Sequence, residues 1–137
     1  MPLLANSTDG ALTRKRIETW AAKEERVTVV AATDAATTQS AATLAGAGEV
    51  VYTMTPTAGR ALTTPTGAEL GAAFTDEGVG TSFRFTVVNL AGATHAITLT
   101  AGASGVTLVG SATVAAASSA SFVAVFTAAN TVSIYRK

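Results

Sequence analysis

Positions 85 to 135 of this chain contain no Asp, Glu, Lys or Arg, an uncharged run of 51 residues. A typical soluble domain would carry about a dozen charges over that length. Apolar residues in the run alternate with polar ones and are interrupted by Gly, Ser, Thr and Asn, which indicates short β-strands joined by turns. Strand edges without charges have little to keep them from pairing with other chains. We therefore expect much of this surface to be covered, by copies of the chain or by a larger assembly.

The composition favours a structural protein that associates with itself. The chain has 137 residues, and its nine basic and nine acidic residues give a formal net charge of zero. The basic excess of a nucleic-acid-binding protein is missing, so we expect no nucleic-acid partner. The uncharged 112–129 segment holds too many Ser and Thr residues for a membrane span, so we expect no membrane partner. Aromatic residues are only 6%, and oligomerisation would add the buried area that a core of small residues lacks.

The chain divides into an N-terminal arm with a linker, residues 1–48, and a β-domain, residues 49–137. Half of the charged residues, nine of eighteen, lie within residues 1–26. Gly46 and Gly48 interrupt the chain just before the β-pattern becomes regular. This change in composition is the reason for placing the boundary there.

The arm itself is predicted in three parts. Residues 11–25 carry a weak helical face that includes Ile17 and Trp20, so this part is either helical or extended until it meets a partner. Residues 27–30 are predicted to form a strand. Residues 31–47, rich in Ala and Thr, are predicted to form a linker or a loosely packed edge.

The second part of the chain predicts a mainly β fold, an antiparallel β-sandwich or barrel with one short helix. That helix is expected over residues 67–74, because Thr66 and Glu69 have the spacing of a capping box. The strands are spaced as in all-β domains. They are predicted at residues 50–54, 81–89, 94–100, 106–109, 112–116, 121–127 and 131–135.

The alternation within these strands also predicts the core. Large apolar residues recur at every second position, as expected for a strand with one buried face. The residues assigned to the β-domain core are Phe83, Phe85, Val87, Ile97, Leu99, Phe122, Phe126 and Ile134. We expect the four Phe rings to pack together.

Six blocks in this half carry a family resemblance. They are TTPTGAELGAA (63–73), VGTSFRFTVVN (79–89), ITLTAG (97–102), GVTLVG (105–110), FVAVFT (122–127) and VSIY (132–135). In this order they resemble a β-domain of tailed-bacteriophage structural proteins, found in capsid decoration proteins and head fibres. The resemblance covers about residues 50–136. It implies a virion protein without enzymatic activity, often a homotrimer.

Residues capable of chemistry are few, and we expect no catalytic, cofactor-binding or metal-binding residues. His95 is the single histidine, and its own segment lacks the charged partner that a catalytic histidine needs. We interpret it as a surface or interface residue. Asp76 and Glu77 form an acidic pair in a predicted loop, where adjacent carboxylates usually diverge; weak cation binding is the alternative. The glycine-containing segments at 78–80 and 105–110 match no phosphate-binding motif.

Taken with the resemblance, these features lead to the hypothesis of a capsid decoration protein. It would bind the outer surface of the major capsid protein lattice on the virion after synthesis in the host cytoplasm, and it would form a homotrimer. The N-terminal arm is the part expected to bind the capsid. The arm residues assigned to this contact are Arg14, Lys15, Arg16, Ile17 and Trp20.

Two other classes stay open. One is a tail-fibre or baseplate component, including one that binds host glycan. The other is a carbohydrate-binding module of a secreted bacterial protein. Glycan binding usually uses exposed aromatic rings, and Tyr52 and Tyr135 are too few for a convincing platform, with Trp20 outside the β-domain.

Overall fold

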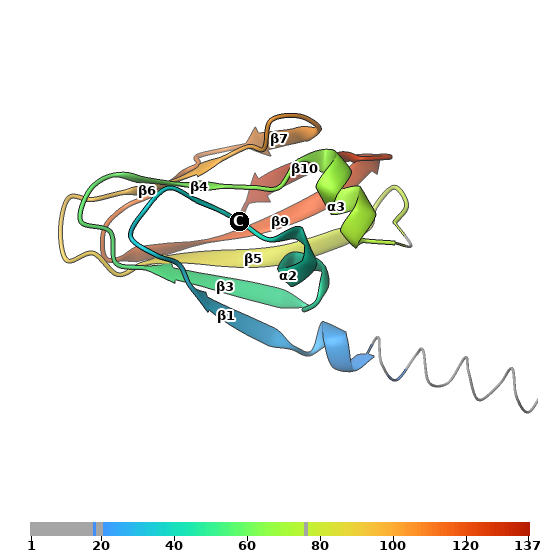
Figure 1. Ribbon diagram of the computed structural model, residues 1–137, viewed down its shortest axis with the longest axis horizontal. Helices are drawn as coiled ribbons and strands as arrows, with labels where there is room; N and C mark the ends of the chain where they lie inside the picture. Colours follow the sequence, from blue (N-terminus) through green and yellow to red (C-terminus); the bar gives the residue numbers. More distant parts are fainter. Residues whose placement is uncertain (1–17, 19–20, 76) are drawn as a thin grey trace, which may run out of the picture.

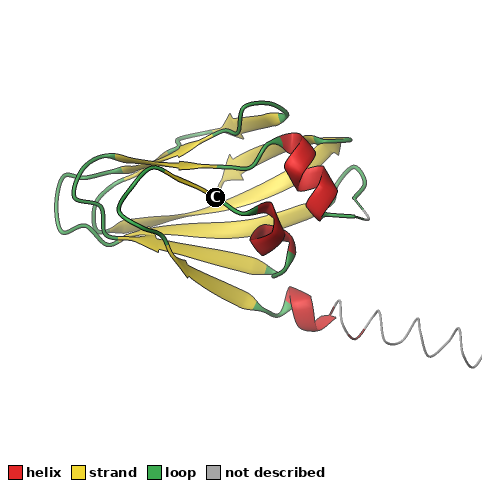
Figure 2. Cartoon of the chain, in the orientation of Figure 1, coloured by secondary structure: helices red, strands yellow, loops and turns green. Residues whose placement is uncertain are grey.

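The computed structural model describes residue 18, residues 21–75 and residues 77–137. In this part of the chain two β-sheets pack as a sandwich, and short helices gather near one end (Figures 1 and 2). The six-stranded sheet has the order β1 (Val27–Ala31), β3 (Glu49–Met54), β5 (Ser82–Asn89), β9 (Ser118–Ala128), β10 (Thr131–Arg136) and β7 (Val106–Val109). The four-stranded sheet has the order β2 (Thr37–Thr38), β4 (Arg60–Thr63), β6 (Ile97–Thr100) and β8 (Thr113–Val114). The mainly β, sandwich-like fold is therefore confirmed.

The expectation of purely antiparallel sheets is wrong, because both sheets are mixed. Strands β1, β3 and β5 run parallel to one another, as do β2, β4 and β6, whereas β5, β9 and β10 pair antiparallel. The reason is the path of the chain, which from β1 to β8 alternates between the two sheets. Each excursion to the opposite sheet acts as the crossover that parallel neighbours require.

Residues 27–48 are built into the sandwich. Of the two alternatives for residues 31–47, the linker is wrong, whereas β2 does lie at an edge, that of the four-stranded sheet. The predicted strand at 27–30 is present as β1, which pairs with β3, and β2 pairs with β4 in the other sheet. Helix α2 (Ala41–Ala45) follows β2 and precedes β3, and its Leu44 is only 2% exposed. The Ser40 side chain caps this helix by accepting a hydrogen bond from the Thr43 amide at 3.2 Å. The small side chains of residues 31–47 allow this close packing. Linkers are rich in the same small residues, so composition alone does not distinguish the two.

The predicted capping box is present at the start of helix α3 (Gly67–Ala73). The Glu69 amide donates to Thr66 Oγ1 at 3.2 Å, and the Thr66 amide donates to Glu69 Oε2 at 2.8 Å. The bond from the Thr66 amide, together with one from the Thr66 hydroxyl to the same oxygen at 2.9 Å, holds the pKa of Glu69 below its usual value. Leu70 then points into the core and is fully buried. A helical turn at residues 21–24 agrees with the helical alternative for residues 11–25, whereas helix α2 was not expected.

All eight predicted core residues are buried. The rings of Phe85 and Phe122 stack with centroids 5.1 Å apart, and those of Phe83 and Phe126 are tilted at 6.4 Å. Phe74, at the end of α3, joins this cluster by stacking on Phe83 at 4.9 Å. The aromatic cluster therefore connects a helix end to the central strands β5 and β9.

Candidate functional site

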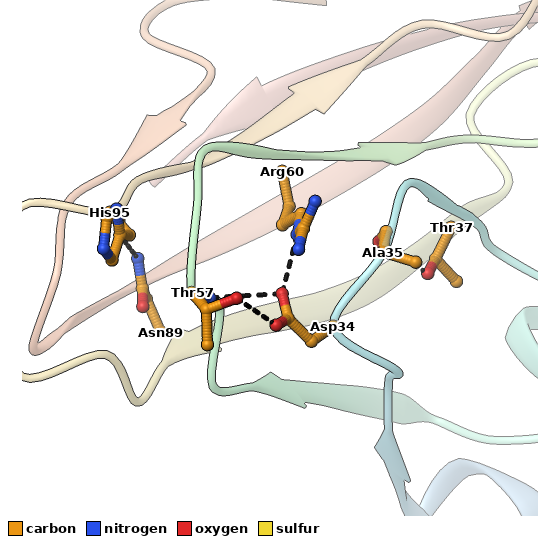
Figure 3. A network of polar contacts seen from close by, with 7 residues as sticks. All are labelled: Asp34, Ala35, Thr37, Thr57, Arg60, Asn89 and His95. Atoms are coloured by element: carbon orange, nitrogen blue, oxygen red, sulfur yellow. Dashed lines mark hydrogen bonds and ion pairs between the residues drawn. The ribbon is translucent and has the colours of Figure 1, made fainter.

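A polar cluster joins the loop between β1 and β2 to the loop between β3 and β4 and to the start of β4 (Figure 3). Asp34 follows β1, and its Oδ1 atom accepts a hydrogen bond from Arg60 Nε at 2.6 Å, at the start of β4. Thr57 donates to the same carboxylate with its backbone amide at 3.2 Å and with its hydroxyl at 2.5 Å. These bonds, led by the one from Arg60, hold the pKa of Asp34 well below its usual range. These partners of the Asp34 carboxylate all come from the chain itself, so the cluster positions two loops and has the character of a structural site.

We expect the substitution Asp34→Asn to lower the melting temperature at neutral pH and to lose this effect in acid. The pKa of Asp34 is lower in the folded than in the unfolded chain, so its stabilisation is present above the ordinary pKa and is lost as the pH falls below about 4. Melting temperatures of wild type and variant should therefore converge between about pH 4 and pH 2. A difference that stays constant over this range would show that the carboxylate charge is not responsible.

His95 contributes its backbone to a second polar contact. The buried Asn89 side chain donates from Nδ2 to the carbonyl oxygens of His95, at 2.8 Å, and Val114, at 3.0 Å (Figure 3). Its Oδ1 atom accepts a hydrogen bond from the Ala91 amide at 3.0 Å. Asn89 thus joins the end of β5 to the chain before β6 and to β8. Sequence reasoning concentrated on the single histidine and missed Asn89, whose position in an alternating strand gave only a weak signal.

Acidic residues do not assemble into a metal centre in the described chain. Asp76 lies outside the described residues, and Glu77 Oε1 accepts a hydrogen bond from the Asn130 amide at 3.5 Å. Over the described ranges, no group of three or more His, Cys, Asp or Glu side chains is placed to hold a metal ion. The contact from Asn130 places Glu77 beside the β9–β10 turn.

Burial raises the pKa of Tyr52 to about 12, and its hydroxyl has no hydrogen-bond partner among the described residues.

The predicted capsid-binding residues Arg14, Lys15, Arg16, Ile17 and Trp20 lie outside the described residues, so their role stays a prediction. The chain after them is packed on the β-domain. Lys23 Nζ lies 5.9 Å from the centre of the Phe74 ring and 3.8 Å from Glu24 Oε1. A pocket of about 320 Å³ adjoins these residues and reaches Arg84 on β5.

A further candidate surface is the face of the six-stranded sheet that points away from the core, which we call the outer face. Burial alternates along its strands, and the strand registers align one row of outward residues across all six strands. That row is Val27, Glu49, Arg84, Val123, Tyr135 and Val109. Val27 and Val29 are 58% and 65% exposed, and Val109 and Tyr135 are also exposed. A face of this kind is suited to contact with another protein surface.

The sequence predicts that the uncharged strands are covered, which stays a prediction, and it did not identify the outer face. The hydrophobic residues of β1 belonged to the predicted arm, far in sequence from Val109 and Tyr135. Only the strand order brings them into one surface.

Comparison with models of known protein families, with curated proteins and with solved structures finds no match for this chain. The fold defines the class as a mainly β, sandwich-like protein. Among the helices in the described ranges, none has the length and apolar character needed to cross a membrane.

Proposed function

We propose that this chain is a structural protein of a bacteriophage virion, a capsid decoration protein that binds the outer surface of the major capsid protein lattice and stabilises the head. The observation that carries the proposal is the outer face, a broad sheet surface with exposed Val27, Val29, Val109 and Tyr135 and few charges. The resemblance of residues 50–136 to virion β-domains supports the same class. In this proposal the work is mechanical, because each bound oligomer adds buried interface between neighbouring capsid subunits.

Two surfaces divide the work in this proposal. The β-domain associates with copies of itself as a homotrimer, which covers part of its uncharged surface. The N-terminal arm binds the capsid, with Arg14, Lys15 and Arg16 supplying charge and Ile17 and Trp20 supplying apolar contact. Aromatic and Arg residues are the types most often found at the energetic centre of protein interfaces.

The test uses capsids that lack the protein and the purified full-length chain. We expect wild type to sediment as a trimer and to bind such capsids in hundreds of copies. The triple substitution of Arg14, Lys15 and Arg16 by Glu should abolish binding while leaving the trimer and its melting temperature unchanged. The control Lys137→Glu, at the opposite end of the chain, should bind like wild type. Binding in tens of copies or fewer at the tail, or full binding by the triple variant, would contradict the assignment.

A further inference from the structure

The six-stranded sheet ends on both sides in a strand that has one open edge (Figure 1). Among the described strands, β1 pairs only with β3, and β7 pairs only with β10. Across the described residues, the backbone hydrogen bonds outside the sheet ladders include none to or from residues 27–31 or 106–109. Neither strand contains a charged residue or a proline, which are common protections of an edge. Both edges can therefore accept a further strand.

The backbone groups that point outward follow from the ladder bonds. In a parallel pair, alternate residues direct both N–H and C=O toward the neighbouring strand. The Arg26 carbonyl and the Ala32 amide, on either side of β1, are both hydrogen-bonded to β3, so the even-numbered residues of β1 face β3 and the odd-numbered ones face outward. In β7 the order is reversed. The Gly105 carbonyl accepts from the Val132 amide of β10 at 2.8 Å, so the even-numbered residues of β7 face outward.

The side chains at the two edges have a matching order. In both strands the odd-numbered side chains are exposed on the outer face, among them Val29 in β1 and Thr107 in β7. When β1 of one copy lies parallel to β7 of another, the outward backbone groups of Val29 meet those of even-numbered residues, and Val29 lies beside an odd-numbered residue. Both side chains then belong to the outer face, so the sheet continues without turning over. Antiparallel pairing of these two edges would instead set Val29 opposite a residue that points toward the core.

Copies of the same chain satisfy both edges at once. Strands β1 and β7 run in the same direction, so a neighbour turned about an axis along the strands brings its β7 beside β1 in the parallel sense. A contact between two different edges is heterologous, and it closes into a ring when the rotation between copies allows. Three copies in such a ring form the homotrimer of the proposed function and leave neither edge open. Contact of β1 with β1, or of β7 with β7, joins copies only in pairs and leaves the other edge unpaired.

We infer that copies of this chain associate edge to edge, with β1 of one copy pairing in parallel with β7 of the next. The inference rests on the self-association part of the proposed function. It goes beyond that function by assigning the two edges and the strand direction of the contact. Main-chain hydrogen bonds supply the contact, as they do where a strand is added to an open sheet edge.

Engineered cysteines test the contact, because the chain has no native cysteine. Four double variants combine Val27→Cys or Val29→Cys with Thr107→Cys or Val109→Cys, which covers the neighbouring registers. Within one copy the two edges lie about 24 Å apart, five strand spacings of about 4.8 Å, so a disulfide can only join two copies. After mild oxidation, at least one double variant should run as a covalent trimer on a non-reducing gel.

The controls use the same positions singly and one position on the other sheet. Each single-cysteine variant should run as a monomer on the non-reducing gel. The pair Val29→Cys with Thr98→Cys, on the exposed side of β6, should also run as a monomer. Dimers formed by a single-cysteine variant would show a two-fold contact and would overturn the inference.

A proline at position 29 tests the main-chain part of the contact. The Val29 amide points outward, so Val29→Pro removes no bond to β3 and should keep the native circular dichroism spectrum. It should raise the concentration at which the oligomer dissociates about 10-fold or more, because a donor at the interface is lost. Val29→Thr, which keeps the amide, should associate like wild type. Normal association of Val29→Pro in sedimentation velocity would exclude backbone pairing at this edge.

The remaining outcomes separate the edge contact from self-association itself. If the wild type sediments as an oligomer but none of the four double variants becomes linked, the edges are left to another chain and the inference is overturned, whereas the proposed self-association still stands. Covalent chains longer than a trimer would support the contact of β1 with β7 and contradict the homotrimer. A monomeric wild type at micromolar concentration would instead overturn the self-association.

Discussion

Replacing Phe85 by Ala should cause the largest loss of stability of any single side-chain truncation in this protein. Phe85 is fully buried between Phe122, with ring centroids 5.1 Å apart, and Tyr52, which meets its ring edge-on at 6.4 Å. Truncating a buried Phe to Ala costs about 3–5 kcal/mol, because transfer energy is lost and a cavity is left. That is a large part of the roughly 5–15 kcal/mol that stabilises a typical domain. We expect a fall in melting temperature of about 10 °C or more, or loss of soluble protein.

The matched control is Thr98→Ala, on the exposed side of β6. Its effect should stay within the roughly 1 kcal/mol span of strand propensities. Thermal melting followed by circular dichroism compares the two variants. If Phe85→Ala melts like wild type but no longer associates, Phe85 lies on an interface and the assignment of the core face is wrong.

Gly67→Ala should be nearly as damaging, although it adds only one methyl group. A Cβ atom at Gly67 would lie 2.0 Å from the carbonyl oxygen of Asn130 and 2.8 Å from that of Gly105. Both are backbone atoms in turns that hold left-handed conformations, with φ of 53° at Asn130 and 73° at Gly105. Neither turn can move without disturbing β7 or β10, which it adjoins. We expect a loss at or above the about 1–3 kcal/mol of ordinary overpacking.

Gly92→Ala provides the comparison for this prediction. A Cβ at Gly92 would meet no atom within 4 Å. The same substitution there should leave stability unchanged or raise it by up to about 1 kcal/mol, because Ala restricts the unfolded chain. Urea denaturation of both variants, analysed with a common slope, measures the difference. Equal midpoints for the two variants would contradict the close backbone approach at Gly67.

Several features were determined by local sequence alone. Alternation along residues 81–89 and 121–127 identified two central strands, present as β5 and β9, and the side on which their Phe residues are buried. The Thr66 and Glu69 spacing identified the start of α3, since a capping box depends on four consecutive residues. The interrupted alternation within the uncharged run identified its β-structure. Each of these signals depends on neighbours in the chain, so sequence pattern was sufficient.

Strand direction and the membership of each sheet were decided only by the tertiary structure. A period of two residues identifies a strand, but it is the same for parallel and antiparallel pairing. Residues 31–47 resembled a linker because Ala and Thr suit both loose chain and tight packing. Strand β4 (Arg60–Thr63) was not expected because it lies between the turn residues Gly59 and Pro65.

The same limit applies to the candidate site. Asp34 binds Arg60 across 26 positions of the chain, and Glu49 is the register neighbour of Arg84 across 35. Val27 and Val109 join one face because β1 and β7 form its opposite edges. These contacts follow from the way the chain alternates between two sheets, and that path is selected by burying one shared core, to which residues far apart in the sequence contribute.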